Sequence, residues 1–279
     1  MSLGIAFKGA EGIVLAADSR VTLLAIDQQQ KMQIPAAFDN ATKLLRIDSQ
    51  KFVGAVTYGV GALGGKLPRT AHSFMSEFEA ELSKKYPPDP NGKVQRLQVE
   101  KFAEELGTFF LARWKETMPL TVSPGNEMIF LVGGYDETEP YGKLFEIQIP
   151  SKPLPRELLE NQFGAAWGGQ REFTDRLLNG FDPQLPNLLQ TALNLTPEQM
   201  SKLEGEVRSK LILAIPYQFL PLQDCVDLSI FLIRTTITLQ KWLVGVRGVG
   251  GFIDVAVITK TEPFSPIQQK KITGEQVLA

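Results

Sequence analysis

Cysteine and histidine are almost absent from this chain, whose 279 residues include one of each, Cys225 and His72. A single cysteine cannot form an internal disulfide, and neither residue alone can supply the several ligands of a zinc site. A Ser-His-Asp triad would have to use His72, which falls in an expected helix among small and polar residues. A hydrolase of this composition therefore needs a nucleophile that is activated without histidine.

An excess of one charge and long apolar runs are also lacking. The 29 Lys and Arg residues balance 31 Asp and Glu residues, which leaves a net charge of −2, whereas nucleic-acid or acidic-membrane partners favour a basic excess. The most apolar stretches, 211–222 and 226–233, are shorter than a bilayer span and are interrupted by Pro216 and Arg234. No secretory signal opens the chain. We therefore expect a soluble, cytoplasmic protein with neither a nucleic-acid nor a membrane partner.

The pattern of apolar residues predicts an α+β domain. Short apolar segments predict strands at 3–8, 12–18, 43–48, 52–58, 127–134, 142–149, around 162–167 and at 251–259. Helical spacing predicts helices over 69–85, 94–116 and 223–243, with broken helices over 170–213. The polar stretch 27–42 is typical of a loop. Runs of strands and helices in this order indicate antiparallel sheets covered by helices over residues 1–262, followed by a C-terminal tail over 263–279.

One motif suggests a dinucleotide site but lacks its context. Gly59-Val60-Gly61-Ala62-Leu63-Gly64 matches G-x-G-x-x-G between a strand and a helix. A dinucleotide-binding unit also needs a second parallel strand with an acidic residue about 20 residues further on, whereas the acidic residues of 77–81 fall within a helix. We interpret the glycines as a close strand-to-helix turn and expect no cofactor and no metal. Dinucleotide binding is the least favoured alternative.

The first segments of the chain resemble the start of a mature proteasome β subunit. Residues 2–8 (SLGIAFK) and 12–22 (GIVLAADSRVT) share its apolar strand, its glycine turn and its A-A-D-S-R-x-T run. Counting back from Asp18 places Ser2 at the position of the family's N-terminal threonine nucleophile. Residues 43–48 (KLLRID) resemble the strand that carries the active-site lysine, which places Lys43 at that position. The Gly-rich segment 54–64 corresponds to the one that borders the substrate cleft.

The resemblance implies a four-layer αββα sandwich of antiparallel sheets, as in N-terminal nucleophile (Ntn) hydrolases, in subunits that form homo-oligomeric rings. The chain looks like the bacterial proteasome relatives that begin with a nucleophile directly after the initiator Met. Ser2 is small enough that methionine aminopeptidase should remove Met1. The implied activity is cleavage of amide bonds in a peptide or protein substrate through an acyl-enzyme on Ser2. The resemblance leaves an ATPase partner open.

Each candidate residue has a role in such chemistry. The free α-amine of Ser2, with an ordinary pKa of about 7.7–8.0, can accept the proton of the Ser2 hydroxyl. Lys43 would help to keep that amine unprotonated and lower the hydroxyl's pKa, and Asp18 would hold Lys43 by a charge-assisted hydrogen bond. Backbone N–H groups near Tyr58 and Gly59 are the expected oxyanion hole.

The chain departs from the family at positions that orient the terminal amine. Serine replaces threonine at position 2, and the loop 23–42 is longer than usual. Gly168-Gly169-Gln170 stands where the family has a serine, and Val246-Arg247-Gly248-Val249 stands where it has an aspartate and a serine before the paired glycines. A catalytically weak or inactive subunit that acts in assembly or binding therefore stays open. We favour the enzyme because Ser2, Asp18 and Lys43 are retained together.

Overall fold

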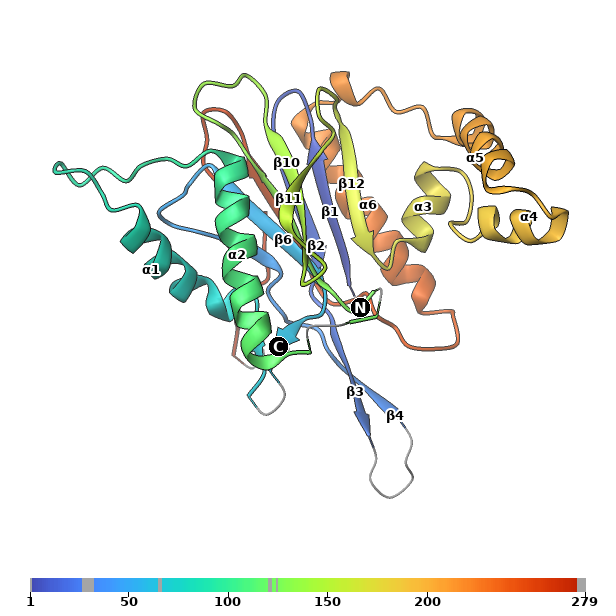
Figure 1. Ribbon diagram of the computed structural model, residues 1–279, viewed down its shortest axis with the longest axis horizontal. Helices are drawn as coiled ribbons and strands as arrows, with labels where there is room; N and C mark the ends of the chain where they lie inside the picture. The colour runs from blue at the N-terminus through green and yellow to red at the C-terminus, as the bar shows by residue number, and fades with distance from the viewer. Residues whose placement is uncertain (1, 27–32, 65–66, 120–121, 124, 275–279) are drawn as a thin grey trace, which may run out of the picture.

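Two five-stranded antiparallel sheets lie face to face in the computed structural model, which describes residues 2–26, 33–64, 67–119, 122–123 and 125–274 (Figure 1). The first sheet has the order β12 (Gly164–Gly169), β1 (Leu3–Lys8), β2 (Ile13–Asp18), β13 (Ile253–Ile258) and β14 (Ser265–Gln268). The second has the order β11 (Lys152–Leu158), β10 (Lys143–Ile149), β9 (Met128–Gly134), β6 (Val53–Gly59) and β5 (Leu44–Arg46).

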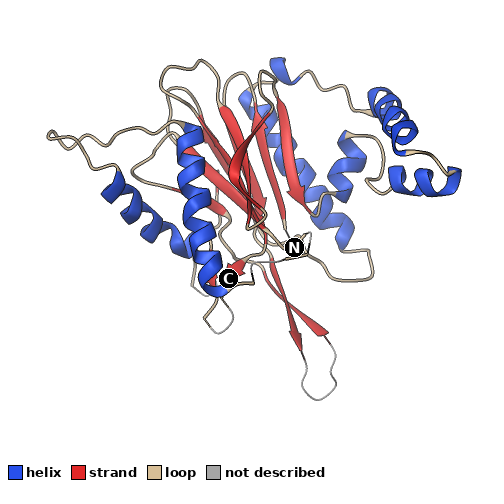
Figure 2. Ribbon diagram, in the orientation of Figure 1, coloured by secondary structure: helices blue, strands red, loops and turns tan. Residues whose placement is uncertain are grey.

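Helices cover the outer face of each sheet, so the molecule is an αββα sandwich (Figure 2). Helices α1 (Met75–Lys85) and α2 (Val99–Thr117) pack on the second sheet, and α3 (Glu172–Leu178) and α6 (Leu222–Gln240) pack on the first. The expected α+β class is thus confirmed. Besides a hairpin described below, the other elements of the described residues are α4 (Leu185–Leu193), α5 (Pro197–Leu211), β7 (Ala62–Leu63), β8 (Arg69–Thr70), and the 3-10 helices η1 (His72–Phe74) and η2 (Tyr217–Phe219).

Within the described ranges, none of the helices combines the length and the apolar character that crossing a bilayer requires.

Helices α4 and α5 lie beyond α3, away from the sheets (Figure 1). Thr196 begins α5 with a capping box, in which its side chain accepts from the backbone N–H of Gln199 while the Gln199 side chain accepts from the Thr196 N–H. Helix α5 therefore begins at a strong local signal.

Strand β1 is buried on both of its faces, which explains its continuous apolar sequence. Its odd-numbered residues, Leu3, Ile5 and Phe7, pack against the helix layer that contains α6, whereas Ala6 faces the second sheet. Alternate residues of a strand point to opposite faces, and both faces here exclude water. Burial on two sides fixes the position of the strand that begins directly after Ser2.

The polar stretch 27–42, expected to be a loop, is partly strand. Strands β3 (Val21–Ile26) and β4 (Gln33–Phe38) form an antiparallel hairpin that projects from one end of the sandwich (Figure 1), while 27–32 lie outside the described residues. Proline argues against a central strand, but a two-stranded ribbon leaves each strand an edge where a missing N–H is tolerated, so Pro35 fits.

Two edge strands were absent from the sequence-based expectation. Strand β11 carries Pro153 and Pro155 and lies at the edge of the second sheet, where prolines are tolerated. Strand β14 lies within the segment 263–279, which was expected to be a tail, and pairs with β13. Just before it, Phe264 is buried between the sheets. The first part of this segment is thus integral to the sandwich.

Candidate active site

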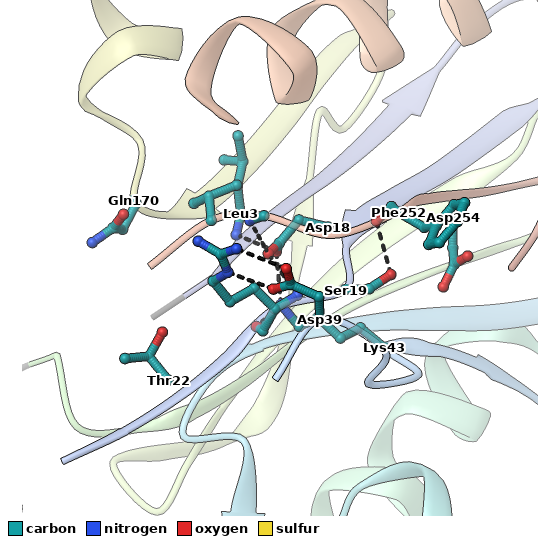
Figure 3. A network of polar contacts seen from close by, with 12 residues as sticks. Leu3, Asp18, Ser19, Thr22, Asp39, Lys43, Gln170, Phe252 and Asp254 are labelled. Carbon is teal, nitrogen blue, oxygen red and sulfur yellow. Dashed lines mark hydrogen bonds and ion pairs between the residues drawn. The ribbon is translucent and has the colours of Figure 1, made fainter. Parts of the chain in front are cut away.

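The antiparallel pairing of β1 and β2 places Asp18 beside the start of the chain. Gly4 pairs with Ala17, so the Leu3 N–H reaches Asp18 and donates to its Oδ1 at 3.0 Å. Lys43 directly precedes β5 of the other sheet, and its Nζ lies 2.7 Å from the same oxygen. Asp18 thereby links the residue after Ser2 to Lys43 across the sandwich (Figure 3).

Asp18 is fully buried, and both of its carboxylate oxygens are supplied with donors. Oδ2 accepts the backbone N–H groups of Arg20 and Gly250, each at 3.0 Å, while Oδ1 accepts from Leu3 and Lys43. An ionised carboxylate survives burial only where charge and hydrogen bonds replace its hydration. Asp18 therefore ties together four segments of the chain around one charge.

Lys43 is also buried, and its ammonium group donates a second hydrogen bond to the Arg20 carbonyl at 2.6 Å. Burial is the strongest influence on this group and lowers the pKa of Lys43, while the adjacent Asp18 opposes that shift. Lys43 consequently releases a proton more readily than a lysine on the surface.

Ser2 and Lys43 line one pocket at this end of the sandwich. Thr57, Tyr58 and Gly59 form one side of it, and the rest of the lining is mostly small or apolar: Val21, Ala41, Thr42, Val60, Gly61, Thr70 and Ala71. Ser2 and a buried lysine therefore border one narrow pocket whose walls are mostly small or apolar.

Gly59 ends β6 in a conformation that glycine alone adopts easily. Its φ is +87°, and a Cβ there would lie 2.1 Å from the Glu127 carbonyl oxygen. The next amide, that of Val60, donates to that same oxygen at 2.9 Å. Neither neighbour of β6 in its sheet runs parallel to it, so the G-x-G-x-x-G segment lacks the parallel unit that a dinucleotide site uses.

The Tyr58 side chain packs against strands β1 and β12 of the first sheet. The side chain is buried so close to β1 and β12 that a Cβ at Gly4 would lie 2.7 Å from its ring and one at Gly168 would lie 2.2 Å from its hydroxyl oxygen. Burial is the main cause of the raised pKa of Tyr58. The side chain therefore packs against β1 and β12, and Tyr58 is also among the residues that line the pocket.

The segments that depart from the proteasome pattern still hold Ser2 in place. The Gln170 N–H donates to the Ser2 carbonyl at 2.7 Å, and Gly169, with φ +94°, passes so close that a Cβ would lie 1.9 Å from that carbonyl oxygen. The Gln170 side chain accepts from Gln240, whose own oxygen accepts the Val249 N–H at 3.0 Å. Met1 lies outside the described residues.

Arg20 and Asp39 are part of this site although the sequence analysis gave them no role. The Arg20 guanidinium forms a two-point ion pair with Asp39 at 2.5 and 2.8 Å, which raises the pKa of Arg20 and lowers that of Asp39. Arg20 lies in the A-A-D-S-R-x-T run and could have been singled out there. Asp39 had no local signal because the β3–β4 hairpin brings it back to Arg20.

The layers, the strand order and the place of Ser2 at the start of a central strand define a proteasome-like Ntn-hydrolase fold. No family model and no curated protein matches the chain. Among solved structures it is similar to Anbu from Hyphomicrobium sp. strain MC1, solved as a Gly-1 mutant, with a TM-score of 0.51 and 14% sequence identity. The match covers 99% of this chain and 88% of that one. Similarity at this level of identity establishes the fold.

Proposed function

We propose that the chain is an N-terminal serine hydrolase that cleaves amide bonds in peptides or proteins. The observation that carries the proposal is the buried Asp18–Lys43 pair, whose lysine lines the same pocket as Ser2. A surface ion pair would have little consequence, but burying two charges is costly even when they are paired. Buried ionisable groups beside a pocket are typical of functional sites. Removal of Met1 would complete the site by freeing the Ser2 amine.

The reaction would proceed in two steps. The Ser2 hydroxyl oxygen attacks the substrate carbonyl while the α-amine of Ser2 takes the hydroxyl proton, and Lys43, held by Asp18, stabilises the developing negative charge. The Gly59 N–H would donate to the oxyanion. The carbon–nitrogen bond of the substrate then breaks. The α-amine of Ser2 gives the proton it had taken to the departing nitrogen, and an ester on Ser2 remains. Water attacks the ester, which releases the acid and restores Ser2.

Labelling by an N-terminal nucleophile probe tests the proposal. Intact mass of the purified protein should show the loss of Met1, and a proteasome-type β-lactone or epoxyketone should add one probe mass. Ser2→Ala should abolish the adduct, and Ser201→Ala, at an exposed serine of α5, should leave it unchanged. Persistence of Met1, or equal labelling of Ser2→Ala, would refute the enzymatic function.

The second candidate is an inactive subunit that acts in assembly or binding. It is favoured by the Gly168-Gly169-Gln170 and Val246–Val249 segments, which lack the family's hydroxyl and carboxylate groups. The Ser2 carbonyl is held by the Gln170 backbone N–H, and Val249 bonds to the Gln240 side chain. This candidate predicts a stable oligomer that no probe labels at any pH. The labelling experiment therefore decides between the two functions.

We also propose that the chain assembles into a homo-oligomeric ring. The support is its proteasome-like fold, shared with Anbu. Native mass spectrometry should show one discrete multiple of the 30.9 kDa chain mass, less the mass of Met1. A monomer at micromolar concentration would contradict ring assembly without bearing on the chemistry of Ser2.

A further inference from the structure

A second buried ion pair lies beside the first. Asp254, on β13, is buried, and Lys270, two residues beyond β14, forms an ion pair with its Oδ2. The Lys270 backbone N–H donates to Asp254 Oδ1 at 3.0 Å, so both oxygens of the carboxylate are engaged by one residue. Little of the Lys270 side chain is exposed. Two attachments to one buried acid fix the course of the chain beyond β14.

This pair adjoins the strand that carries Asp18. Asp254 pairs with Ala17 across β13 and β2, and the next pair along joins Ile253 to Asp18. Lys270 Nζ also lies 3.4 Å from the hydroxyl of Ser19, the residue after Asp18. Figure 3 shows Asp18, Ser19 and Lys43 together, with Asp254 close by. The pair formed by Lys270 therefore lies one residue along the chain from the carboxylate that holds Lys43.

Among the described residues, four charged groups from different elements act on Lys43. Asp18 is hydrogen-bonded to it. Asp254 attracts it and Lys270 repels it, and Asp39, itself bound by Arg20, is also within electrostatic reach. Because Lys270 neutralises Asp254, and Arg20 neutralises Asp39, Asp18 is left as the carboxylate available to Lys43.

We propose that Lys270 is a positioning residue of the candidate active site: the C-terminal segment delivers its ammonium group to Asp254 and thereby keeps Lys43 paired with Asp18. The catalytic consequence rests on the proposed function, whereas the effect on Lys43 does not. The segment after β14 would then serve the site as well as the edge of the sheet. The resemblance at the N-terminus gave no indication of such a role.

Removal of either charge should shift the pKa of Lys43 in a predictable direction. Without Lys270, Asp254 becomes an unpaired buried carboxylate, and the more negative surroundings raise the pKa of Lys43 and of the Ser2 amine. Without Asp254, Lys270 is the unpaired charge, and both pKa values fall. With both removed, the local net charge returns to its original value. Removing one unit charge beside a partly screened site should shift a neighbouring pKa by about 0.5 to 1 unit.

The direct test measures the titration of Lys43 by carbon-13 NMR of lysine Cε, with the signal assigned by its loss in Lys43→Arg. Lys270→Gln should raise the midpoint, Asp254→Asn should lower it, and the double variant should titrate like the original protein. Glutamine keeps an N–H donor for Asp254 and so protects folding, which Lys270→Met would endanger. Lys271→Gln, at the exposed neighbouring lysine, is the matched control and should have no effect.

The second measurement is the pH dependence of probe labelling at Ser2. The midpoint of the acidic limb should move upward in Lys270→Gln, downward in Asp254→Asn, and back in the double variant. If the original protein is not labelled at any pH, the proposed function fails while the NMR titration still tests Lys270. Equal titrations of Lys43 in Lys270→Gln and Lys271→Gln, or shifts in the same direction for Lys270→Gln and Asp254→Asn, would overturn the inference.

Discussion

At the scale of single residues, Asp18 determines the geometry of the site. It accepts hydrogen bonds from β1, from the residues that follow β2, from the turn before β13 and from Lys43. A carboxylate with this many donors is both a structural centre and an electrostatic one. Loss of this carboxylate should therefore lower both the free energy of unfolding and the reactivity of the site.

Asp18→Asn should destabilise the fold by about 3 to 5 kcal/mol, because it leaves the buried Lys43 ammonium without its counter-charge. Urea unfolding measures the change. The matched control is Asp48→Asn, at a carboxylate whose side chain is 73% exposed in a surface pair with Arg46, and its effect should stay within about 0.5 kcal/mol. Equal stability of the two variants would contradict the role given to Asp18.

Gly169→Ala should displace Ser2. The added methyl would meet the Ser2 carbonyl, and the positive φ strains any side chain, so a cost of about 1–3 kcal/mol and a loss of probe labelling are expected. Gly205→Ala, in α5 with no atom within 4 Å of the new methyl, should instead stabilise by about 0.5–1 kcal/mol. Thermal melts of the two variants should move in opposite directions.

At the scale of elements, the segment from Phe264 to Lys270 closes the first sheet. Phe264 N–H donates to the Lys51 carbonyl at 2.7 Å, and its ring lies against Gly54, where a Cβ would come within 2.3 Å of it. This segment thereby joins the edge of one sheet to β6 of the other before it pairs as β14. Its contribution comes from packing between the sheets as much as from strand pairing.

Phe264→Ala should destabilise the protein by about 3 to 5 kcal/mol, because it empties a ring-sized volume between the sheets. Phe219→Ala, at a ring that is 78% exposed, should change the free energy of unfolding by no more than about 0.5 kcal/mol. Chemical denaturation compares the two. A small effect at Phe264 would mean that β14 is held chiefly by its backbone pairing.

At the scale of the whole molecule, the reaction rate of the lone cysteine measures how readily the sandwich opens. Cys225 is buried near the start of α6, against the first sheet, and burial raises the pKa of its thiol to about 11. The thiolate is the reactive form, so the native protein at pH 8 should react with a disulfide reagent about a hundredfold or more slowly than the protein in urea. Rapid native reaction would show that α6 opens readily.

The same thiol gives a linkage prediction. The unfolded group ionises near 9 and the folded group near 11, so the unfolded state loses its proton first as pH rises. The stability that the protonated thiol contributes is present below pH 9 and falls as pH rises toward 11. Cys225→Ala should lack this component, which urea unfolding at pH 8 and pH 10 would detect as a difference between the two proteins.

The sequence by itself determined the α+β class, because apolar spacing is a local signal. Its resemblance to a proteasome β subunit over 2–22 and 43–48 is what singled out Asp18 and Lys43. The apolar spacing missed β11 and β14, whose prolines and polar residues suit edge strands that only a neighbouring strand reveals. The tertiary structure alone decided that Asp39, Gly250, Asp254 and Lys270 meet around Asp18 and Lys43. These residues come together because antiparallel pairing joins positions far apart in the chain. Each buried charge is then paired because an unpaired one would strongly destabilise the fold.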